Sequence, residues 1–294
     1  MHCGKILSRI MDEDPDIYVL DGDLADSNGA ILVHERHPDR FIMSGIAEQC
    51  MVSVAAGLSN VGAKPWVFSF AAFLCYRAYD QIRIGVSQAC TNVKLVGSHA
   101  GGFTGRNGQT HAAVNDIALM ASLPNIKVWS PASPGNLQYA IQQMVKDPSP
   151  AYLRLPREPL ADLPSQEKEW YWLQPPQAIN ILATGITVHI ALEIKVLLEK
   201  MNIVVGIINV NKIAPIPESL VAEVNKIGNH LVVIEDHYRV FGLANLLSVA
   251  GVNCKIHSKG WGMEFFGESG DYVDILNAYD LNPSDIAREI SNLI

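Results

Sequence analysis

The chain has 294 residues, which is long enough for two domains with separate cores. An apolar fraction of 49% with 18% charged residues is typical of a soluble globular protein. The formal charge of −8, without any cluster of Lys and Arg, argues against nucleic-acid binding. The five cysteines are widely spaced and form no C-x-x-C pair, which argues against a disulfide scaffold and favours a reducing compartment. The N-terminus lacks a signal-peptide core, and no apolar run approaches the roughly 20 residues of a membrane span, so we expect a cytoplasmic protein.

In the first part of the chain, short apolar runs alternate with helical patterns. Strands are expected at 17–20, 64–69, 93–97, 126–129 and 151–155, and helices at 49–58, 76–89 and 115–122. Strands separated by helix-sized segments are typical of βαβ units in a mostly parallel sheet. We therefore expect a first domain over residues 1–165.

A segment rich in proline and charge then interrupts the pattern and predicts a linker over 166–177. A second α/β series follows over 178–294. Its strands are expected at 179–183, 203–208 and 231–234, and its helices at 188–200, 217–226 and 283–293. The predicted fold is α/β, with two domains that each hold a mostly parallel sheet flanked by helices.

The run from Ser44 to Met51 places a single carboxylate, Glu48, at a strand-to-helix turn among small and apolar residues. A carboxyl group in such a place is costly to bury without a partner. The ring nitrogen of an aminopyrimidine is a suitable partner, because a carboxyl group can protonate it, and this is how thiamine diphosphate is activated. Glu48 is therefore the first candidate for a catalytic residue.

Three aromatic residues, Phe70, Phe73 and Tyr76, follow an expected strand at a spacing of three. From spacing alone, a core stripe is the simpler interpretation. Their position favours a wall around a flat ring, because ligands of parallel sheets bind at the carboxyl ends of the strands.

A glycine-rich segment runs from His99 to His111, and two arginines, Arg154 and Arg157, flank the end of another expected strand. Long glycine loops after strands commonly carry function, and two histidines that frame one loop indicate a site that handles protons or anions. The arginines are candidates for a phosphate or carboxylate anchor, although a salt bridge explains one of them equally well.

At these residues the chain resembles the C-terminal two-thirds of a transketolase. The matching blocks, in the family's order, are Leu20 to Asn28, His37 to Phe41, Gly45 to Gln49, Phe70 to Phe73, Arg77 to Arg83, Gly97 to His99, Gly108 to His111 and Ile234 to Tyr238. The resemblance implies a pyrimidine-binding domain followed by the transketolase C-terminal domain, which stabilises the assembly.

The resemblance also implies roles for individual residues. Glu48 matches the acid that bonds the aminopyrimidine, and His99 and His111 match catalytic histidines that contact the substrate. Further cofactor contacts are implied for Asp23, Leu24, Phe70, Phe73 and Tyr76, and further substrate contacts for Ser27, Asn107 and Arg157. The implied reaction is the transfer of a two-carbon ketol unit from a ketose (phosphate) to an aldose (phosphate), with the organic chemistry supplied by thiamine diphosphate.

Two departures from the family pattern shape the prediction. The domain that binds diphosphate and Mg²⁺ (or Ca²⁺) is not found, and Asp21-Gly22-Asp23 has the wrong order for its metal signature. We therefore expect no metal ligand on this chain, a separate N-terminal partner subunit and a two-fold α2β2 assembly. Arg106 and Asn107 stand where the family has two acidic residues, which leaves the sugar specificity open.

The resemblance admits alternatives. A β subunit of a thiamine-dependent 2-oxoacid dehydrogenase, or an enzyme similar to deoxyxylulose-phosphate synthase, shares the block around Glu48, whereas the blocks at Phe70 and His99 favour transketolase. A non-catalytic homologue is a third possibility, and the presence of Glu48, His99 and His111 argues against it.

Overall fold

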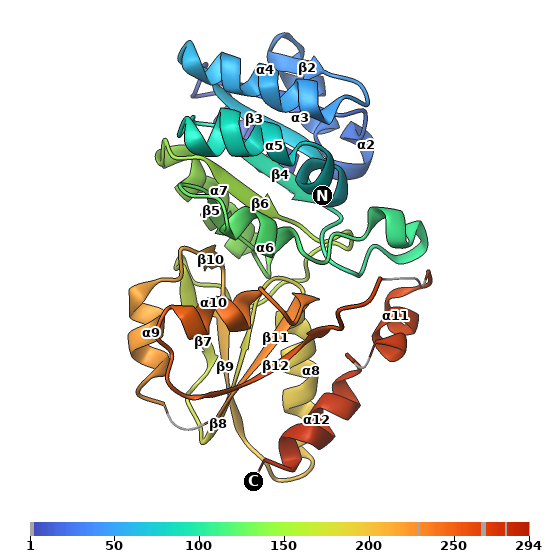
Figure 1. The fold of residues 1–294 in the computed structure, drawn as a ribbon, viewed down its shortest axis with the longest axis vertical. Helices are drawn as coiled ribbons and strands as arrows, with labels where there is room; N and C mark the ends of the chain where they lie inside the picture. Colours follow the sequence, from blue (N-terminus) through green and yellow to red (C-terminus); the bar gives the residue numbers. More distant parts are fainter. Residues whose placement is uncertain (1–2, 228–229, 266–268, 280, 294) are drawn as a thin grey trace.

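A computed structural model describes residues 3–227, 230–265, 269–279 and 281–293. Two α/β halves lie one above the other, and each consists of a sheet with helices packed on it (Figure 1). The expected fold class is confirmed.

The first sheet has seven strands in the order β10-β5-β6-β4-β3-β1-β2, and all neighbours pair in parallel except β10, which runs antiparallel to β5. Its strands are β1 (Ile17–Asp21), β2 (Phe41–Met43), β3 (Lys64–Phe70), β4 (Lys94–Ser98), β5 (Lys127–Trp129), β6 (Ala151–Arg154) and β10 (Lys212–Ala214). Strands β4 and β6 are buried along their whole length, as expected where helices cover both faces of a parallel sheet.

Helical segments connect these strands. They are α1 (Cys3–Ile10), α2 (Ala25–Asn28), α3 (Ile31–Arg36), η1 (Pro38–Arg40), α4 (Glu48–Asn60), η2 (Phe73–Arg77), α5 (Tyr79–Gln81), η3 (Ile82–Gln88), η4 (Gly105–Asn107), η5 (Gln109–His111), α6 (Asp116–Ala121) and α7 (Pro134–Lys146). The helix expected at 76–89 is largely π-helical in η2 and η3, a form that frequently occurs at functional sites. The sequence analysis missed α7, although Ser133 caps it and Pro134 opens it, which is a recognisable start signal.

The second sheet has five strands in the order β12-β11-β8-β9-β7. Its strands are β7 (Trp170–Gln174), β8 (Ile179–Ala183), β9 (Val205–Val210), β11 (His230–Tyr238) and β12 (Lys255–Trp261), and its helices are α8 (Thr187–Glu199), α9 (Glu218–Val224), α10 (Leu243–Val249), α11 (Tyr272–Ala278) and α12 (Pro283–Ser291). Strand β7 lies inside the expected linker at 166–177 and pairs antiparallel with β9. The linker prediction is therefore wrong for these five residues, because β7 hydrogen-bonds along the edge of the sheet despite the surrounding prolines.

The two halves of the chain share one sheet edge and one hydrophobic cluster. Strand β10 comes from the sequence range assigned to the second domain, yet it completes one edge of the first sheet beside β5. One hydrophobic cluster contains side chains of both sheets, among them Val128 and Tyr152 of the first and Leu182 and Val233 of the second. The halves are therefore packed as one body.

Gly97 in β4 provides a test of this packing. A Cβ atom at Gly97 would overlap the buried ring of Tyr152, and the strand leads directly to His99. We expect Gly97→Ala to lower the free energy of unfolding by about 1–3 kcal/mol, measured by urea denaturation of the chain. Gly57→Ala in α4 is the control, since its Cβ meets nothing within 4 Å. An equal effect of the two changes would contradict the assigned packing.

Candidate active site

Glu48 is the first residue of α4, and it lies on the buried face of that helix. The helix follows β2 through a sharp turn in which Gly45 has a φ of +67°, a conformation that favours glycine. The residues of α4 that are buried are Glu48, Met51, Val52, Ala55 and Ala56, whose spacing defines one helical face. The sequence thus places a carboxylate where a core helix would normally carry an apolar side chain, close to the favourable N-terminal end of the helix dipole.

An ion pair compensates the Glu48 charge on one side only. Nη1 of Arg77 donates to Oε2 of Glu48 at 2.6 Å. The Glu48 side chain is 1% exposed, whereas that of Arg77 is 47% exposed. The other carboxylate oxygen, Oε1, is buried and has no hydrogen-bond partner among the described residues. A buried acceptor without a partner is costly, so this oxygen is a candidate for a bond to a ligand.

Aromatic rings extend from this ion pair. The Arg77 guanidinium lies 5.1 Å from the centre of the Phe73 ring. Phe73 stacks on Phe70, with ring centres 5.7 Å apart, and Phe70 stacks on His99 at 3.9 Å. The edge of His111 meets Phe73 at 5.2 Å. Glu48 and four of the predicted residues are therefore joined through Arg77 into one continuous cluster.

The two histidines have different surroundings. His99 is 8% exposed and follows β4 with a φ of +55°. Burial, with smaller electrostatic contributions from Arg157 and His111, lowers the pKa of His99 to about 4. His111 is partly exposed in η5, and its Nδ1 lies 2.8 Å from the hydroxyl of Thr110. The lowered pKa keeps the His99 ring neutral at physiological pH.

Asp23, Leu24 and Ser27 follow β1, at the same sheet edge as the cluster. Asp23 has a φ of +68°, and the backbone N–H of Leu24 donates to the buried carboxylate of Asp21 at 2.7 Å. Ser27 is exposed in α2. The side-chain amide of Asn28 also donates to Asp21, at 2.6 Å, so Asp21 holds the turn that presents Asp23 and Leu24.

Tyr76 and Arg157 contact the chain on either side of η4, and Asn107 lies within η4. The hydroxyl of Tyr76 donates to the side-chain oxygen of Asn115, beyond η5. Asn107 is exposed in η4, and the side chain of its neighbour Arg106 lies outside the described structure. Arg157 donates to the carbonyl of Thr104 at 2.8 Å, under the glycine-rich loop. The structure therefore places Tyr76 and Arg157 against the loop.

Sequence reasoning missed the role of Arg77 in the site. The available signal was its spacing of four residues after Phe73, which brings a cation over an aromatic ring on a helical segment. Its pairing with Glu48 joins residues 29 positions apart and requires the packing of η2 against α4.

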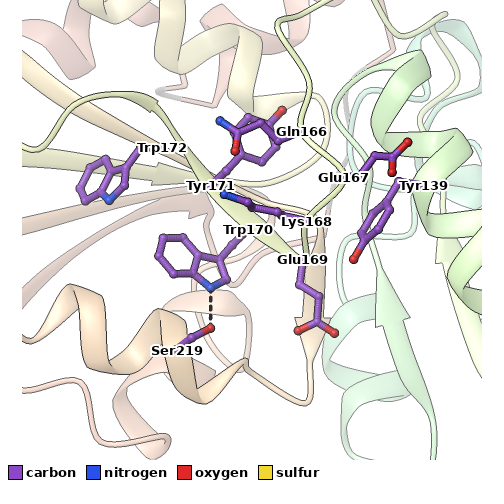
Figure 2. Close-up of a pocket in the computed structure, with 9 residues that line it drawn as sticks. All are labelled: Tyr139, Gln166, Glu167, Lys168, Glu169, Trp170, Tyr171, Trp172 and Ser219. Carbon is purple, nitrogen blue, oxygen red and sulfur yellow. Dashed lines mark hydrogen bonds between the residues drawn. The ribbon is translucent and has the colours of Figure 1, made fainter.

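One cavity is separate from the Glu48 cluster, and a second one adjoins it. One, of about 460 Å³, lies between β7, α7 and α9 (Figure 2). It is lined by Tyr139, Gln166, Glu167, Lys168, Glu169, Trp170, Tyr171, Trp172 and Ser219. The indole N–H of Trp170 donates to Ser219 and that of Trp172 to Glu223, so these two donors are already satisfied. The other, of about 580 Å³, adjoins the site and lies between Tyr76 and Tyr238.

Within the described residues, no three His, Cys, Asp or Glu side chains lie together in a way that could hold a metal ion. In the same part of the chain, no helix has the length and apolar character needed to cross a bilayer.

Comparison with known proteins gives the family. The model of the transketolase pyrimidine-binding domain matches residues 1–161, and that of the transketolase C-terminal domain matches residues 169–286. The chain belongs to the transketolase family. The match covers both halves of the fold and includes the Glu48 cluster.

Several relatives have a similar length. A protein of Methanocaldococcus jannaschii whose name assigns it to a transketolase C-terminal section is 31% identical, over 98% of this chain and 93% of its own length. A subunit of 6-deoxy-6-sulfo-D-fructose transketolase from Clostridium sp. MSTE9 is 31% identical, over 96% of this chain and 90% of its own. The solved structure of a split-gene transketolase, described as an inactive β4 tetramer, has a TM-score of 0.87 at 30% identity and covers 99% of this chain and 95% of that one. The chain is thus similar to C-terminal subunits of split transketolases.

The lowered pKa of His99 predicts the pH range in which its ring becomes protonated. In NMR spectra of the chain, the His99 ring should show no protonation step above about pH 5, and His99→Gln assigns its signals. The unfolded chain takes up a proton near pH 6.5 that folded His99 does not, so this residue's contribution to stability is present above pH 6.5 and is lost as the pH falls towards 4. A midpoint above pH 6 would contradict the buried, neutral state.

The ion pair predicts a coupling between Glu48 and Arg77. Arg77→Met should lower the free energy of unfolding by about 1–3 kcal/mol, because it leaves a buried carboxylate without its donor. In a Glu48→Gln background the same change should have less effect, since no buried charge remains. Urea denaturation of the four proteins measures the coupling, and additive effects would show that the pair does not interact.

Proposed function

We propose that this chain is the C-terminal subunit of a thiamine-diphosphate-dependent transketolase, which transfers a two-carbon ketol unit from a ketose to an aldose. The observation that carries the proposal is the buried Oε1 of Glu48, which has no partner among the described residues and adjoins a cluster of stacked rings. A protonated or proton-sharing contact with an aminopyrimidine nitrogen would satisfy this oxygen. The residues present therefore fit the cofactor that the family implies.

Each residue of the cluster has a task in this proposal. Glu48 holds and moves the proton at the ring nitrogen, while Arg77 keeps the carboxylate oriented through Oε2. Phe70 and Phe73 pack against the flat ring, with Tyr76 at the outer edge. Asp23 and Leu24 contact the cofactor from the turn after β1. Thiamine diphosphate, when bound, supplies the carbon centre that accepts the two-carbon unit.

Substrate contacts come from the loop side. His99, as a neutral imidazole, and His111 bond sugar hydroxyls and the oxygen on which charge develops. Ser27 and Arg157 bind the anionic end of the substrate, and Asn107 takes the place of a family acid in contacting a hydroxyl. Arg157 must release the Thr104 carbonyl, or share its remaining donors, to do so.

The complete enzyme requires a second polypeptide in this proposal. Residues 1–165 bind the pyrimidine and 178–294 stabilise the assembly, while an N-terminal subunit binds the diphosphate and its Mg²⁺ or Ca²⁺. Two copies of each subunit form the α2β2 assembly. The relatives named as a transketolase C-terminal section and as a split-gene transketolase support a separate partner. The five unpaired cysteines fit the reducing cytoplasm.

One alternative function has support from a relative. A 1-deoxy-D-xylulose-5-phosphate synthase of Clostridium tetani is 26% identical over 99% of this chain and 48% of its own length. Such an enzyme, or a 2-oxoacid dehydrogenase β subunit, would release carbon dioxide from a 2-oxoacid. Assays of ketol transfer and of 2-oxoacid decarboxylation on the same preparation distinguish the two.

Glu48→Gln is the direct test. In the enzyme reconstituted with its diphosphate-binding partner, this change should reduce ketol transfer by roughly 10²–10⁴-fold, because an amide cannot exchange the proton. Circular dichroism and size-exclusion chromatography should show unchanged folding and assembly. The exposed change Asp80→Asn is the matched control and should keep full activity. Near-native turnover of Glu48→Gln, or turnover by the chain without its partner, would contradict the proposal.

A further inference from the structure

The block from Ile234 to Tyr238 has no role in the proposed reaction, yet the structure buries three consecutive ionisable residues there. Glu235, Asp236 and His237 are at most 1% exposed. They end β11, in the second half of the chain, where its pairing with β12 becomes irregular. Buried polar groups of this kind need partners, so their contacts identify what this end of β11 holds.

Two hydrogen bonds at this end of β11 reach the glycine-rich loop and the residues just after it. Oδ1 of Asp236 accepts a hydrogen bond from the backbone N–H of Gly102 at 2.8 Å. The backbone N–H of Tyr238 donates to the carbonyl of Val114 at 2.7 Å. Gly102 lies three residues after His99, and Val114 lies three residues after His111. The second domain therefore hydrogen-bonds to the backbone three residues after each of the two histidines.

The loop closes on itself at the same place. Gly101 and Ala113 form an isolated antiparallel bridge with bonds of 3.0 and 3.1 Å. Gly101 has a φ of +84°, and a Cβ atom there would overlap the carboxylate of Asp236. This close approach requires glycine and leaves the loop no room to shift while Asp236 stays in place.

Apolar packing anchors the intervening segment. Phe103 packs between Trp261 and Tyr272, with ring centres 5.0 and 4.7 Å away, and belongs to the hydrophobic cluster of the second domain. In Figure 1 the loop lies at the boundary of the two halves, above α11. The indole N–H of Trp261 also donates to Oδ1 of Asp236, at 2.7 Å.

A buried arginine fixes Asp236 from the other side. Arg154 is 2% exposed, and its Nε donates to Asp116 at 2.8 Å. Its Nη2 donates to the backbone carbonyl of Asp236 and lies 3.6 Å from Oδ2 of that residue. Tyr152 completes the cluster by donating to Asp116 at 2.8 Å. Asp236 is thus held by groups of both domains, and burial raises the pKa of its carboxyl to about 7.

We propose that Asp236 is a positioning residue, which through the backbone of Gly102 fixes the loop that presents His99 and His111 to the substrate. The second domain then contributes to turnover as well as to assembly. The role of the histidines rests on the proposed function. The hydrogen bond between Asp236 and Gly102 does not depend on that function. Asp236 is 1% exposed, so in this proposal it acts through the loop and not by direct contact with the cofactor or substrate.

The first test measures amide hydrogen exchange in the full chain by mass spectrometry. Asp236→Ala should accelerate exchange in peptides from 99–113 by about tenfold or more, because Gly102 loses its acceptor. Asp236→Asn keeps an oxygen for that bond and should restore slow exchange. Tyr152→Phe is the matched control, since it removes a hydrogen bond from the same buried cluster without touching the loop. Wild-type exchange of the loop in Asp236→Ala, or equal acceleration by Tyr152→Phe, overturns the proposal.

The second test uses the enzyme reconstituted with its partner. Asp236→Ala should lower kcat by about tenfold while the KM for thiamine diphosphate stays unchanged, because Glu48 and Phe73 lie on other elements. If Asp236→Ala does not fold, Gly101→Ala acts from the loop side and should give the same two effects. Unchanged exchange and kcat in Gly101→Ala overturn the proposal. Should wild type transfer no ketol unit, the proposed function fails, and the exchange measurement still decides the positioning role.

Discussion

Burial of the Glu48 carboxylate is the constraint on which the candidate site depends. A charge on the apolar face of α4 costs several kcal/mol unless another group compensates it. Arg77 compensates one oxygen and in doing so fixes η2 against α4. Because η2 also carries Phe73, the ring cluster and both histidines are arranged relative to this one ion pair. The second oxygen is buried without a partner among the described residues.

Much of the site followed from the sequence through one physical rule. Glu48 and His99 follow strands and Phe70 ends one, and the carboxyl ends of parallel strands meet at one edge of a sheet. Their proximity was therefore predictable without coordinates. The ion pair with Arg77 was not, because charge pairing depends on how two helical segments pack. The Asp236 contact joins residues 134 positions apart, and no local pattern encodes it.

The secondary structure also divides into elements that the sequence predicts and elements that it does not. Strands such as β4, β6 and β8 are buried along their whole length and mostly apolar, so composition predicts them. Strands β2 and β10 have only three residues, and β12 carries polar side chains, so neither length nor hydrophobicity marks them. β7 lies next to prolines that predict a loop, and only its pairing with β9 makes it a strand. Tertiary context decides these elements.

The position of β10 affects which fragments of the chain can be expressed separately. A fragment that stops after the proline-rich segment would keep β5 but lose the strand that covers its outer edge. The exposed row of backbone donors and acceptors could then recruit strands from other molecules, which is how unprotected sheet edges nucleate aggregates. The first half is consequently unsuited to expression on its own, because β10 protects the edge of its sheet.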